Sequence, residues 1–133
     1  MESFEHLRRA YTVLLTTRRR DGSTVDTPVN LAVDEHGVGY FRTWSTSGKA
    51  KRLRNFPGVR VAPCSVTGRA QGSDQPAVAS LLSETDSERA RSLLAQRFPI
   101  VHGRLVPLLH RMQHRRTVYY RLVPADEPTP WDG

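Results

Sequence analysis

The sequence predicts a mainly β fold with helices, in which six antiparallel strands form one small closed barrel. Short apolar and β-branched runs recur along the chain, and turn residues such as Asp-Gly separate them. The 133 residues suffice for one domain with its own hydrophobic core. We expect this domain to cover residues 1–123 and a flexible, Pro-rich tail to follow at residues 124–133.

The strands follow from the apolar runs and from the turns between them. Asp21-Gly22 lies between the first two runs, which predicts a β-hairpin. A second turn at residues 34–37 leads into the third strand, so the first three strands form a meander. Pro28 lacks an N–H and therefore predicts an edge or a bulge in the second strand. The six predicted strands are residues 11–17, 24–33, 38–42, 59–65, 69–82 and 117–123, the fifth of which is interrupted around residues 72–76.

Capping residues locate the helices. We expect Ser3 to cap a short leading helix and Ser47 to cap the second helix. The pattern Thr85-Asp-Ser-Glu88 is that of a capping box and is expected to open the third helix. Its apolar face consists of Ala90, Leu93, Leu94 and Phe98. The four predicted helices are residues 3–10, 49–55, 85–98 and 105–114.

Composition bears on disulfide formation, membrane insertion and the compartment of the protein. Cys64 is the single cysteine, so no internal disulfide forms, and its place on an apolar strand predicts a structural role. No apolar run approaches the roughly 20 residues of a membrane-spanning helix. The first 20 residues carry five Arg where a signal peptide needs an apolar stretch. We therefore expect a cytoplasmic protein without membrane insertion.

The positive charge is concentrated in one part of the chain. The formal net charge is +7, with 18 Arg and 2 Lys against 13 acidic residues. Residues 36–73 contribute seven positive charges and no acid, whereas the rest of the chain balances at 13 against 13. Such grouping predicts an anionic partner, either a nucleic acid or a phosphorylated small molecule.

Several kinds of catalytic site lack their required residues. No hydroxyl, thiol or carboxylate is paired with a recognisable base, no glycine pattern forms a phosphate-binding loop, and paired acids are absent. His110 and His114 have the i, i+4 spacing of zinc ligands, but no third ligand accompanies them. We therefore predict no catalytic side chain and no metal ligand, and interpret these histidines as surface residues.

The segment from Arg42 to Asn55 is the candidate anion site. Loop hydroxyls precede a helix whose first turns are basic, and a helix N-terminus offers free N–H groups with a partial positive charge. Lys49 and Arg52 are three residues apart, so they share a helix face and can reach one anion. The sequence therefore predicts a phosphate site here. The alternative is a solvated basic helix without a ligand.

The motifs around this segment resemble a known family. They are Leu14-Leu-Thr-Thr-Arg, Thr27-Pro28-Val, Tyr40-Phe-Arg-Thr43, Ser47-Gly-Lys49-Ala-Lys51-Arg52 and Val59-Arg-Val-Ala-Pro63-Cys64. In this order they resemble the flavin and deazaflavin oxidoreductases of the FMN-binding split β-barrel fold, which include pyridoxamine 5′-phosphate oxidase-like proteins. The resemblance is strongest to the actinobacterial branch that uses the deazaflavin coenzyme F420. It covers about residues 4–70 and, more loosely, the last strand.

The resemblance implies a homodimer with coenzyme grooves at the interface. Lys49 and Arg52 match the residues that bind the coenzyme phosphate, and Ser47, Ala50 and Lys51 lie beside them. The end of the strand beneath this region matches Arg42 and Thr43. The strand that borders the tricyclic ring matches Thr27, Pro28, Val29 and Asn30. We further hypothesise that Lys51, Arg54 or Arg60 attracts the oligoglutamate tail of F420.

The implied activity is hydride transfer between F420 and a small conjugated or quinone-like substrate. Because the coenzyme supplies the hydride, such a protein needs no acid–base residue of its own. Two alternatives remain open: an FMN-dependent oxidase or flavin reductase of the same fold, and a non-enzymatic module that binds a cofactor or nucleic acid. Nucleic-acid binding is disfavoured because Trp44 is the one aromatic residue in the basic segment before Lys49.

Overall fold

The computed structural model describes residues 3–10, 12–65, 69, 72, 74–99 and 116–125. Their strands form one seven-stranded sheet in the order β2-β1-β5-β6-β7-β4-β3, with every pair antiparallel. The strands are β1 (Thr12–Arg18), β2 (Thr24–Val29), β3 (Ala32–Val33), β4 (Gly39–Trp44), β5 (Gly58–Cys64), β6 (Gln75–Leu81) and β7 (Thr117–Pro124). The helices are the 3₁₀ turn η1 (Glu5–Leu7), α1 (Gly48–Asn55) and α2 (Glu84–Arg97).

The sheet curls into a split barrel, which confirms the predicted fold class. The strand count differs, because the single strand expected at residues 24–33 divides at Asn30 and Leu31 into β2 and β3. β2 pairs with β1, while β3 pairs with β4, so the expected three-strand meander is divided at the same point. Since β2 and β3 are the two edges of the sheet, the short link between them closes the barrel. Pro28 lies exposed on the edge strand β2, as predicted.

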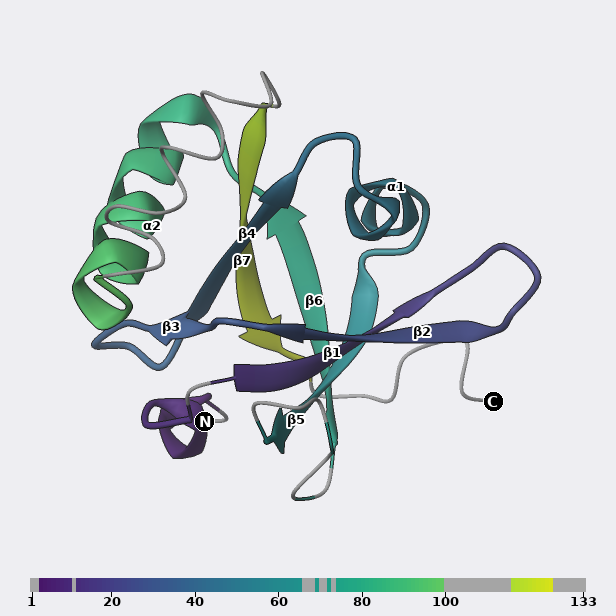
Figure 1. Cartoon of the computed structure of the whole chain (residues 1–133), viewed down its shortest axis with the longest axis horizontal. Coiled ribbons are helices and arrows are strands. Elements are labelled where there is room, and N and C mark those ends of the chain that lie inside the picture. The colour runs from purple at the N-terminus through teal and green to yellow at the C-terminus, as the bar shows by residue number, and fades with distance from the viewer. Residues whose placement is uncertain are drawn as a thin grey trace.

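The inner face of the sheet holds the main core. Alternate residues of β1, Val13 and Leu15, point inward and are fully buried. Phe41 stacks on Tyr120 across β4 and β7, with ring centroids 5.3 Å apart. In Figure 1, α2 and α1 lie at opposite sides of the barrel, and the β1–β2 hairpin extends past the sheet on the α1 side. The hairpin and α1 therefore share one side of the molecule.

The N-caps predicted for the first and third helices are wrong by one and two residues. The leading helix is reduced to η1, whose N-cap position is occupied by Phe4 instead of Ser3. Ser3 still accepts a hydrogen bond from the Glu5 N–H at 3.3 Å. Helix α2 is capped by Ser83, whose side chain accepts from the Asp86 N–H, so its N-cap lies two residues before Thr85 and the helix begins at Glu84. Its apolar face is as predicted, because Ala90, Leu94 and Phe98 are buried.

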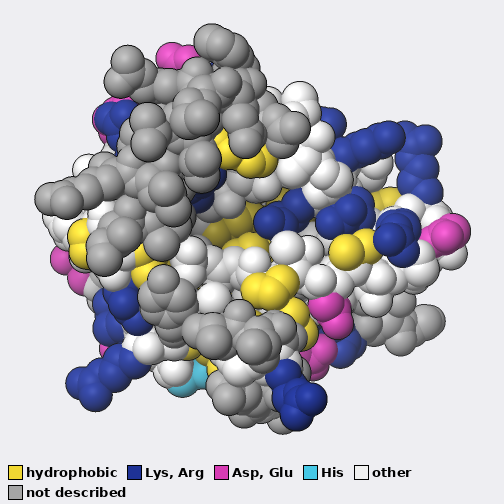
Figure 2. Space-filling model, in the orientation of Figure 1, with side chains coloured by type: hydrophobic (Ala, Val, Ile, Leu, Met, Phe, Trp, Pro, Cys, Tyr) yellow, Lys and Arg dark blue, Asp and Glu magenta, His cyan; other side chains and the backbone are white. Residues whose placement is uncertain are grey.

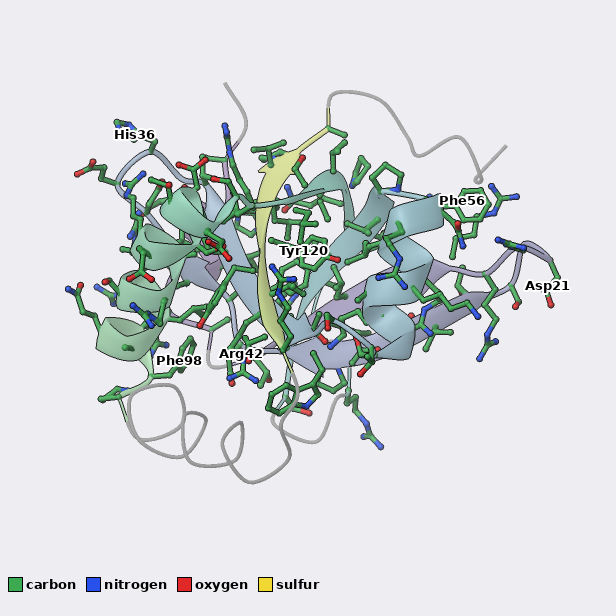
Figure 3. All side chains as sticks on the ribbon, turned by 90° about the horizontal axis from the view of Figure 1, so that it is seen from above. Asp21, His36, Arg42, Phe56, Phe98 and Tyr120 are labelled. Atoms are coloured by element: carbon green, nitrogen blue, oxygen red, sulfur yellow. The ribbon has the colours of Figure 1, made fainter. Side chains whose placement is uncertain are left out.

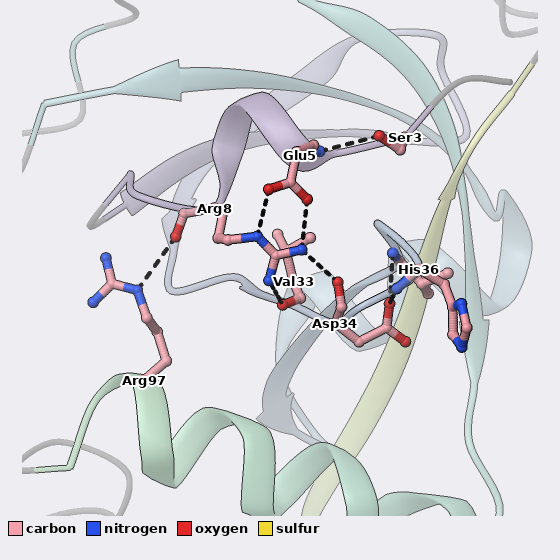
Figure 4. A network of polar contacts seen from close by, with 8 residues as sticks. Ser3, Glu5, Arg8, Val33, Asp34, His36 and Arg97 are labelled. Atoms are coloured by element: carbon pink, nitrogen blue, oxygen red, sulfur yellow. Dashed lines mark hydrogen bonds and ion pairs between the residues drawn. The ribbon is translucent and has the colours of Figure 1, made fainter.

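A polar network fastens the N-terminal turn to the β3–β4 turn (Figure 4). Arg8 forms an ion pair with Glu5 and donates to the carbonyls of Val33 and Asp34 at 2.8 and 2.6 Å. The β3–β4 turn passes close to Ser3 at Gly37, whose φ of 79° and lack of a Cβ permit this approach. Arg97 extends the network from α2 to the carbonyl of Arg8. These contacts fix the end of the barrel opposite α1.

Some predictions fall outside the described residues, namely the helix at residues 105–114 and the tail beyond residue 125. The described helices include none long and apolar enough to cross a membrane.

Candidate functional site

Two hydroxyl groups fix the point at which α1 begins. The Ser47 side chain accepts a hydrogen bond from the Ala50 N–H at 3.0 Å, which confirms it as the N-cap. Its oxygen also lies 2.9 Å from the hydroxyl of Thr43, which is buried at the end of β4. The first N–H groups of a helix have no intrahelical acceptor, and Ser47 satisfies that of Ala50. The N–H groups of Gly48 and Lys49 are therefore oriented for a ligand anion.

Lys49 is a half-buried cation without an acidic partner. Burial is the largest cause that lowers the pKa of its ammonium, and together with the positive charges of Arg52 and Arg42 it brings this pKa to about 8. Among the described residues, no carboxylate forms an ion pair with Lys49. An anion bound beside Lys49 would offset both the burial and the repulsion.

Arg52 is held over the start of α1. Its Nε donates at 2.7 Å to the hydroxyl of Thr17, which is fully buried on the inner face of β1. Its Nη1 lies so close to Gly48 that a Cβ built on Gly48 would be 2.8 Å away from it. Gly48 therefore leaves the space in which the guanidinium sits. Burial and the charge of Arg19 lower the pKa of Arg52.

Arg42 is the third cation of this group. It projects from β4 opposite Tyr119 of β7, and its guanidinium stacks on the Trp44 ring at 5.2 Å. Its Nη1 is buried without a hydrogen-bond partner among the described residues. Burial also lowers the pKa of Arg42. In Figure 3, α1 lies between the sheet that carries Arg42 and the hairpin tip marked by Asp21.

An open hollow of about 370 Å³ lies between α1 and the β1–β2 hairpin. Figure 2 shows Lys and Arg side chains gathered over these two elements. Arg18 is fixed there by stacking on Phe56, with its Cζ 4.6 Å from the ring centroid. The residues that line the hollow are Arg18, Arg19, Arg20, Gly48, Lys51, Arg52 and Asn55.

Two of the predicted phosphate residues, Lys51 and Arg52, line the hollow. Lys49 is absent from its lining and lies within the electrostatic reach of both Arg52 and Arg42. Ala50 is fully buried, and its N–H is occupied by Ser47. Ala50, Ser47 and Thr43 therefore have structural roles at the start of the helix. The cations Lys49, Arg52 and Arg42 remain available to an anion.

The predicted ring-binding segment lies on the edge strand. Thr27, Pro28 and Val29 stand opposite Leu15, Leu14 and Val13 of β1. Leu15, the partner of Thr27, is two residues along β1 from Thr17, whose hydroxyl accepts the hydrogen bond from Arg52. Thr27 and Val29 share the inward face with their β1 partners, whereas Pro28 is exposed. Asn30 is half-buried in the link that joins β2 to β3.

Other candidate residues have structural partners. Arg60, on β5, forms an ion pair with Asp74 at 3.2 Å, and Arg54 donates to the Ser45 carbonyl. Cys64 is buried with its sulfur 3.5 Å from the Thr12 hydroxyl, which supports its predicted structural role. No cluster of three or more potential metal ligands occurs in the part of the chain that the structure describes. His110 and His114 lie outside that part.

Sequence reasoning missed the hairpin arginines as site residues. Arg18, Arg19 and Arg20 form the one run of three consecutive cations in the sequence and precede the Asp21-Gly22 turn. This run of arginines is visible in the sequence. Its position beside α1 could not be predicted from the sequence, because the approach of the hairpin to α1 depends on the curl of the sheet.

Solved structures share this architecture. A heme storage protein from Vibrio cholerae, HutZ, is 18% identical, with 95% of this chain and 93% of that chain covered and a TM-score of 0.67. An F420 reductase is 16% identical over 94% and 95% of the two chains, with a TM-score of 0.62. A proposed pyridoxamine 5′-phosphate oxidase from Listeria innocua is 17% identical over 90% and 88%, with a TM-score of 0.61.

The chain has the split β-barrel fold. No protein-family model matches the sequence, and no curated protein sequence matches it either. At these identities the similarity concerns the fold, and within that fold the neighbours bear different names, from heme storage to F420 reduction.

Proposed function

We propose that this protein is an oxidoreductase that uses the deazaflavin F420 to transfer hydride to or from a small conjugated or quinone-like substrate. The observation that carries the proposal is the start of α1, where Lys49 lies within the electrostatic reach of Arg52 and Arg42 and has no acidic partner among the described residues. Helix N–H groups and unpaired cations are a donor set that fits a phosphate group. The F420 reductase with the same fold supports this coenzyme.

The chain's own residues would bind and orient the coenzyme. Lys49 and Arg52 would hold its phosphate at the start of α1, where Thr17 and Ser47 keep the geometry fixed. The edge strand at Thr27–Asn30 would border the ring. When bound, the deazaflavin supplies the hydride chemistry, so the protein contributes position, electrostatics and exclusion of water.

FMN is the second candidate coenzyme. Its phosphate would suit the same donors, and the proposed pyridoxamine 5′-phosphate oxidase of Listeria innocua has the same fold. The hollow beyond the phosphate site, with its additional cations, favours the more highly charged F420.

The proposal includes a cytoplasmic homodimer in which the partner completes the groove for the ring. Apolar side chains of β6 are available for such an interface, because Val78 and Leu81 are 36% and 59% exposed. Light scattering should give twice the 15.0 kDa mass of the chain. A monomeric mass would contradict this part of the proposal.

The direct test is a binding titration of the purified protein with F420 and with FMN. F420 should bind more tightly than FMN, and Lys49→Ala combined with Arg52→Ala should abolish binding. Arg116→Ala with Arg121→Ala is the matched control, because it removes the same charge from exposed positions on and beside β7. Undiminished binding by the Lys49/Arg52 variant would show that the phosphate site is elsewhere.

Activity is tested separately with reduced F420 and a panel of quinones, monitored by coenzyme absorbance. Oxidation of the coenzyme that depends on protein and acceptor supports the oxidoreductase. Tight binding of F420 without turnover of any acceptor would leave a coenzyme-binding module instead.

A further inference from the structure

Arg42 is a cation that the proposed phosphate contacts of Lys49 and Arg52 leave unused. Its chain neighbours on β4, Phe41 and Thr43, are buried, so the Arg42 side chain lies on the outer face of the sheet. The register of β4 with β7 sets Arg42 opposite Tyr119. Because the β7 strand buries the residue after Tyr119 in the core, Tyr119 also lies on the outer face. The two side chains are therefore neighbours on one face of the barrel.

The Arg42 guanidinium lacks an acceptor among the described residues. Its Nη1 is buried without a hydrogen-bond partner there, and no described carboxylate forms an ion pair with it. The Trp44 ring supports the guanidinium from one side, with its centroid 5.2 Å from the Cζ atom. A charged donor that is buried without an acceptor is costly. A ligand that supplied an oxygen atom at this point would remove that cost.

Tyr119 adds a second donor beside the guanidinium. Burial raises the pKa of its phenol, the charges of Arg42 and Arg91 lower it, and the charge of Glu88 raises it. Since the pKa lies above its ordinary value, the hydroxyl is protonated at neutral pH and can donate a hydrogen bond. A guanidinium and a phenol side by side suit a carboxylate, which accepts hydrogen bonds from several donors at once.

This pair of donors lies beside the proposed coenzyme site. Arg42 is within the electrostatic reach of Lys49, and β4 contacts both α1 and α2. Ala32 of β3 pairs with Tyr40, and the same register continued by two residues sets Asn30 at the level of Arg42. Asn30 ends the segment that is expected to border the coenzyme ring. Figure 2 shows the surface hollowed between α1 and α2, with hydrophobic side chains at its floor. A ligand bound there would lie next to the coenzyme.

We propose that Arg42 and Tyr119 bind the carboxylate of the substrate, so that the preferred acceptor is a conjugated aromatic carboxylate. The guanidinium and the phenol would hold the carboxylate oxygens, and the Trp44 ring would border the conjugated part of the molecule. The use of this site for a substrate rests on the proposed function, whereas the binding of the carboxylate does not require the coenzyme. The proposal narrows the substrate class from conjugated compounds in general to those that carry a carboxylate.

The probes are trans-cinnamate, a conjugated aromatic carboxylate, and trans-cinnamamide, its neutral analogue of similar shape. NMR titration measures their dissociation constants with the protein free of coenzyme, and cinnamate should bind more tightly. Arg42→Gln should weaken cinnamate binding roughly ten- to hundredfold and Tyr119→Phe roughly three- to tenfold, because each removes a donor to a charged oxygen. Cinnamamide should change less than about threefold in either variant. Equal affinities of the two probes in the wild type, or an unchanged preference in Arg42→Gln, would overturn the proposal.

The matched control is Arg121→Gln, which removes an exposed cation two residues from Tyr119 on the same face of β7. It should leave the preference for cinnamate over cinnamamide unchanged. If it lowers that preference as much as Arg42→Gln does, net charge explains the effect and the pair is not the site.

A second variant covers the case in which Arg42→Gln does not fold, which thermal unfolding would show. Arg42→Lys keeps the charge but lacks the guanidinium Nη1. We expect it to bind cinnamate at least about threefold more weakly than the wild type does. Wild-type affinity in Arg42→Lys would contradict the role of the guanidinium.

Inorganic phosphate separates this site from the phosphate site of the proposed function. Phosphate bound at Lys49 and Arg52 should weaken cinnamate binding only up to a limit, because two anions at separate, neighbouring sites repel each other. Displacement of cinnamate without limit would show that both anions share one site and that the proposal is wrong. Failure of F420 and FMN to bind would contradict the proposed function alone, since the cinnamate titration uses neither coenzyme.

Discussion

At the scale of single residues, the charged side chains of Asp34 and Lys49 differ in whether they can still pair with a ligand. Asp34 is 4% exposed, and burial would raise the pKa of its carboxyl. Hydrogen bonds from the N–H groups of Val38 and His36 and from the Tyr40 hydroxyl outweigh burial and lower that pKa. Lys49 has no comparable partners in the described chain, and its pKa falls to about 8. Asp34 is therefore structural, whereas Lys49 is available to an anion.

This difference predicts a pH dependence of F420 binding. In the free protein, Lys49 loses its proton above about pH 8, whereas a bound anion favours the protonated form. Affinity should be nearly constant up to about pH 7, fall to roughly half by about pH 8 and then decrease by up to roughly tenfold per pH unit. Lys49→Met should bind more weakly but without this dependence. A wild-type dissociation constant that stays constant up to about pH 9.5 would contradict the assignment.

At the scale of elements, the two α-helices show what local sequence can predict. The prediction of Ser47 as the N-cap is confirmed, because it is the last of the loop hydroxyls before the basic helix. At α2 two patterns compete, Ser83 with Asp86 and Thr85 with Glu88, and both have capping-box spacing. The tie is decided by tertiary structure, because β6 ends at Leu81 and the Leu82 N–H donates to Tyr119 of β7. The chain is then free to turn at Ser83.

The corrected cap of α2 is testable by stability. Ser83→Ala should lower the free energy of unfolding by about 1 kcal/mol, because the Asp86 N–H loses its acceptor. Thr85→Ala should change it by less than about 0.5 kcal/mol, since Thr85 is an exposed residue inside the first turn. Urea unfolding followed by circular dichroism measures both. A larger loss for Thr85→Ala would restore the capping box at residues 85–88.

The close approach of Arg52 to Gly48 predicts opposite effects on stability and binding. Gly48→Ala should leave the free energy of unfolding unchanged or raise it by up to about 1 kcal/mol, because alanine favours a helix. The new Cβ would displace the Arg52 guanidinium and weaken coenzyme binding by roughly five- to twentyfold. Urea unfolding and F420 titration measure the two effects. Unchanged affinity would show that Arg52 does not contact the phosphate.

At the scale of the whole molecule, the predictable features are those that depend on one stretch of chain. The barrel class, the edge position of Pro28 and the Ser47 cap of α1 follow from local patterns. The division between β2 and β3 does not, because it depends on the pairing of one run with both β1 and β4. The hollow is likewise hidden, because residues 18–20 and 48–55 meet there through the curl of the sheet.

The distribution of charge over the molecule predicts how salt affects binding. Arg19, Arg20 and Lys51 are exposed, so dissolved ions screen them, and the Debye length falls from about 10 Å at 0.1 M salt to about 3 Å at 1 M. Lys49 is half-buried and is screened less. The affinity for F420 with its oligoglutamate tail should therefore decrease more steeply with salt than the affinity for F420 trimmed of its glutamates. Titrations at several chloride concentrations give the two slopes, and Arg19→Gln with Arg20→Gln should make them more nearly equal. Parallel slopes in the wild type would mean that the tail does not reach the exposed cations and that the phosphate site alone accounts for the electrostatic part of binding.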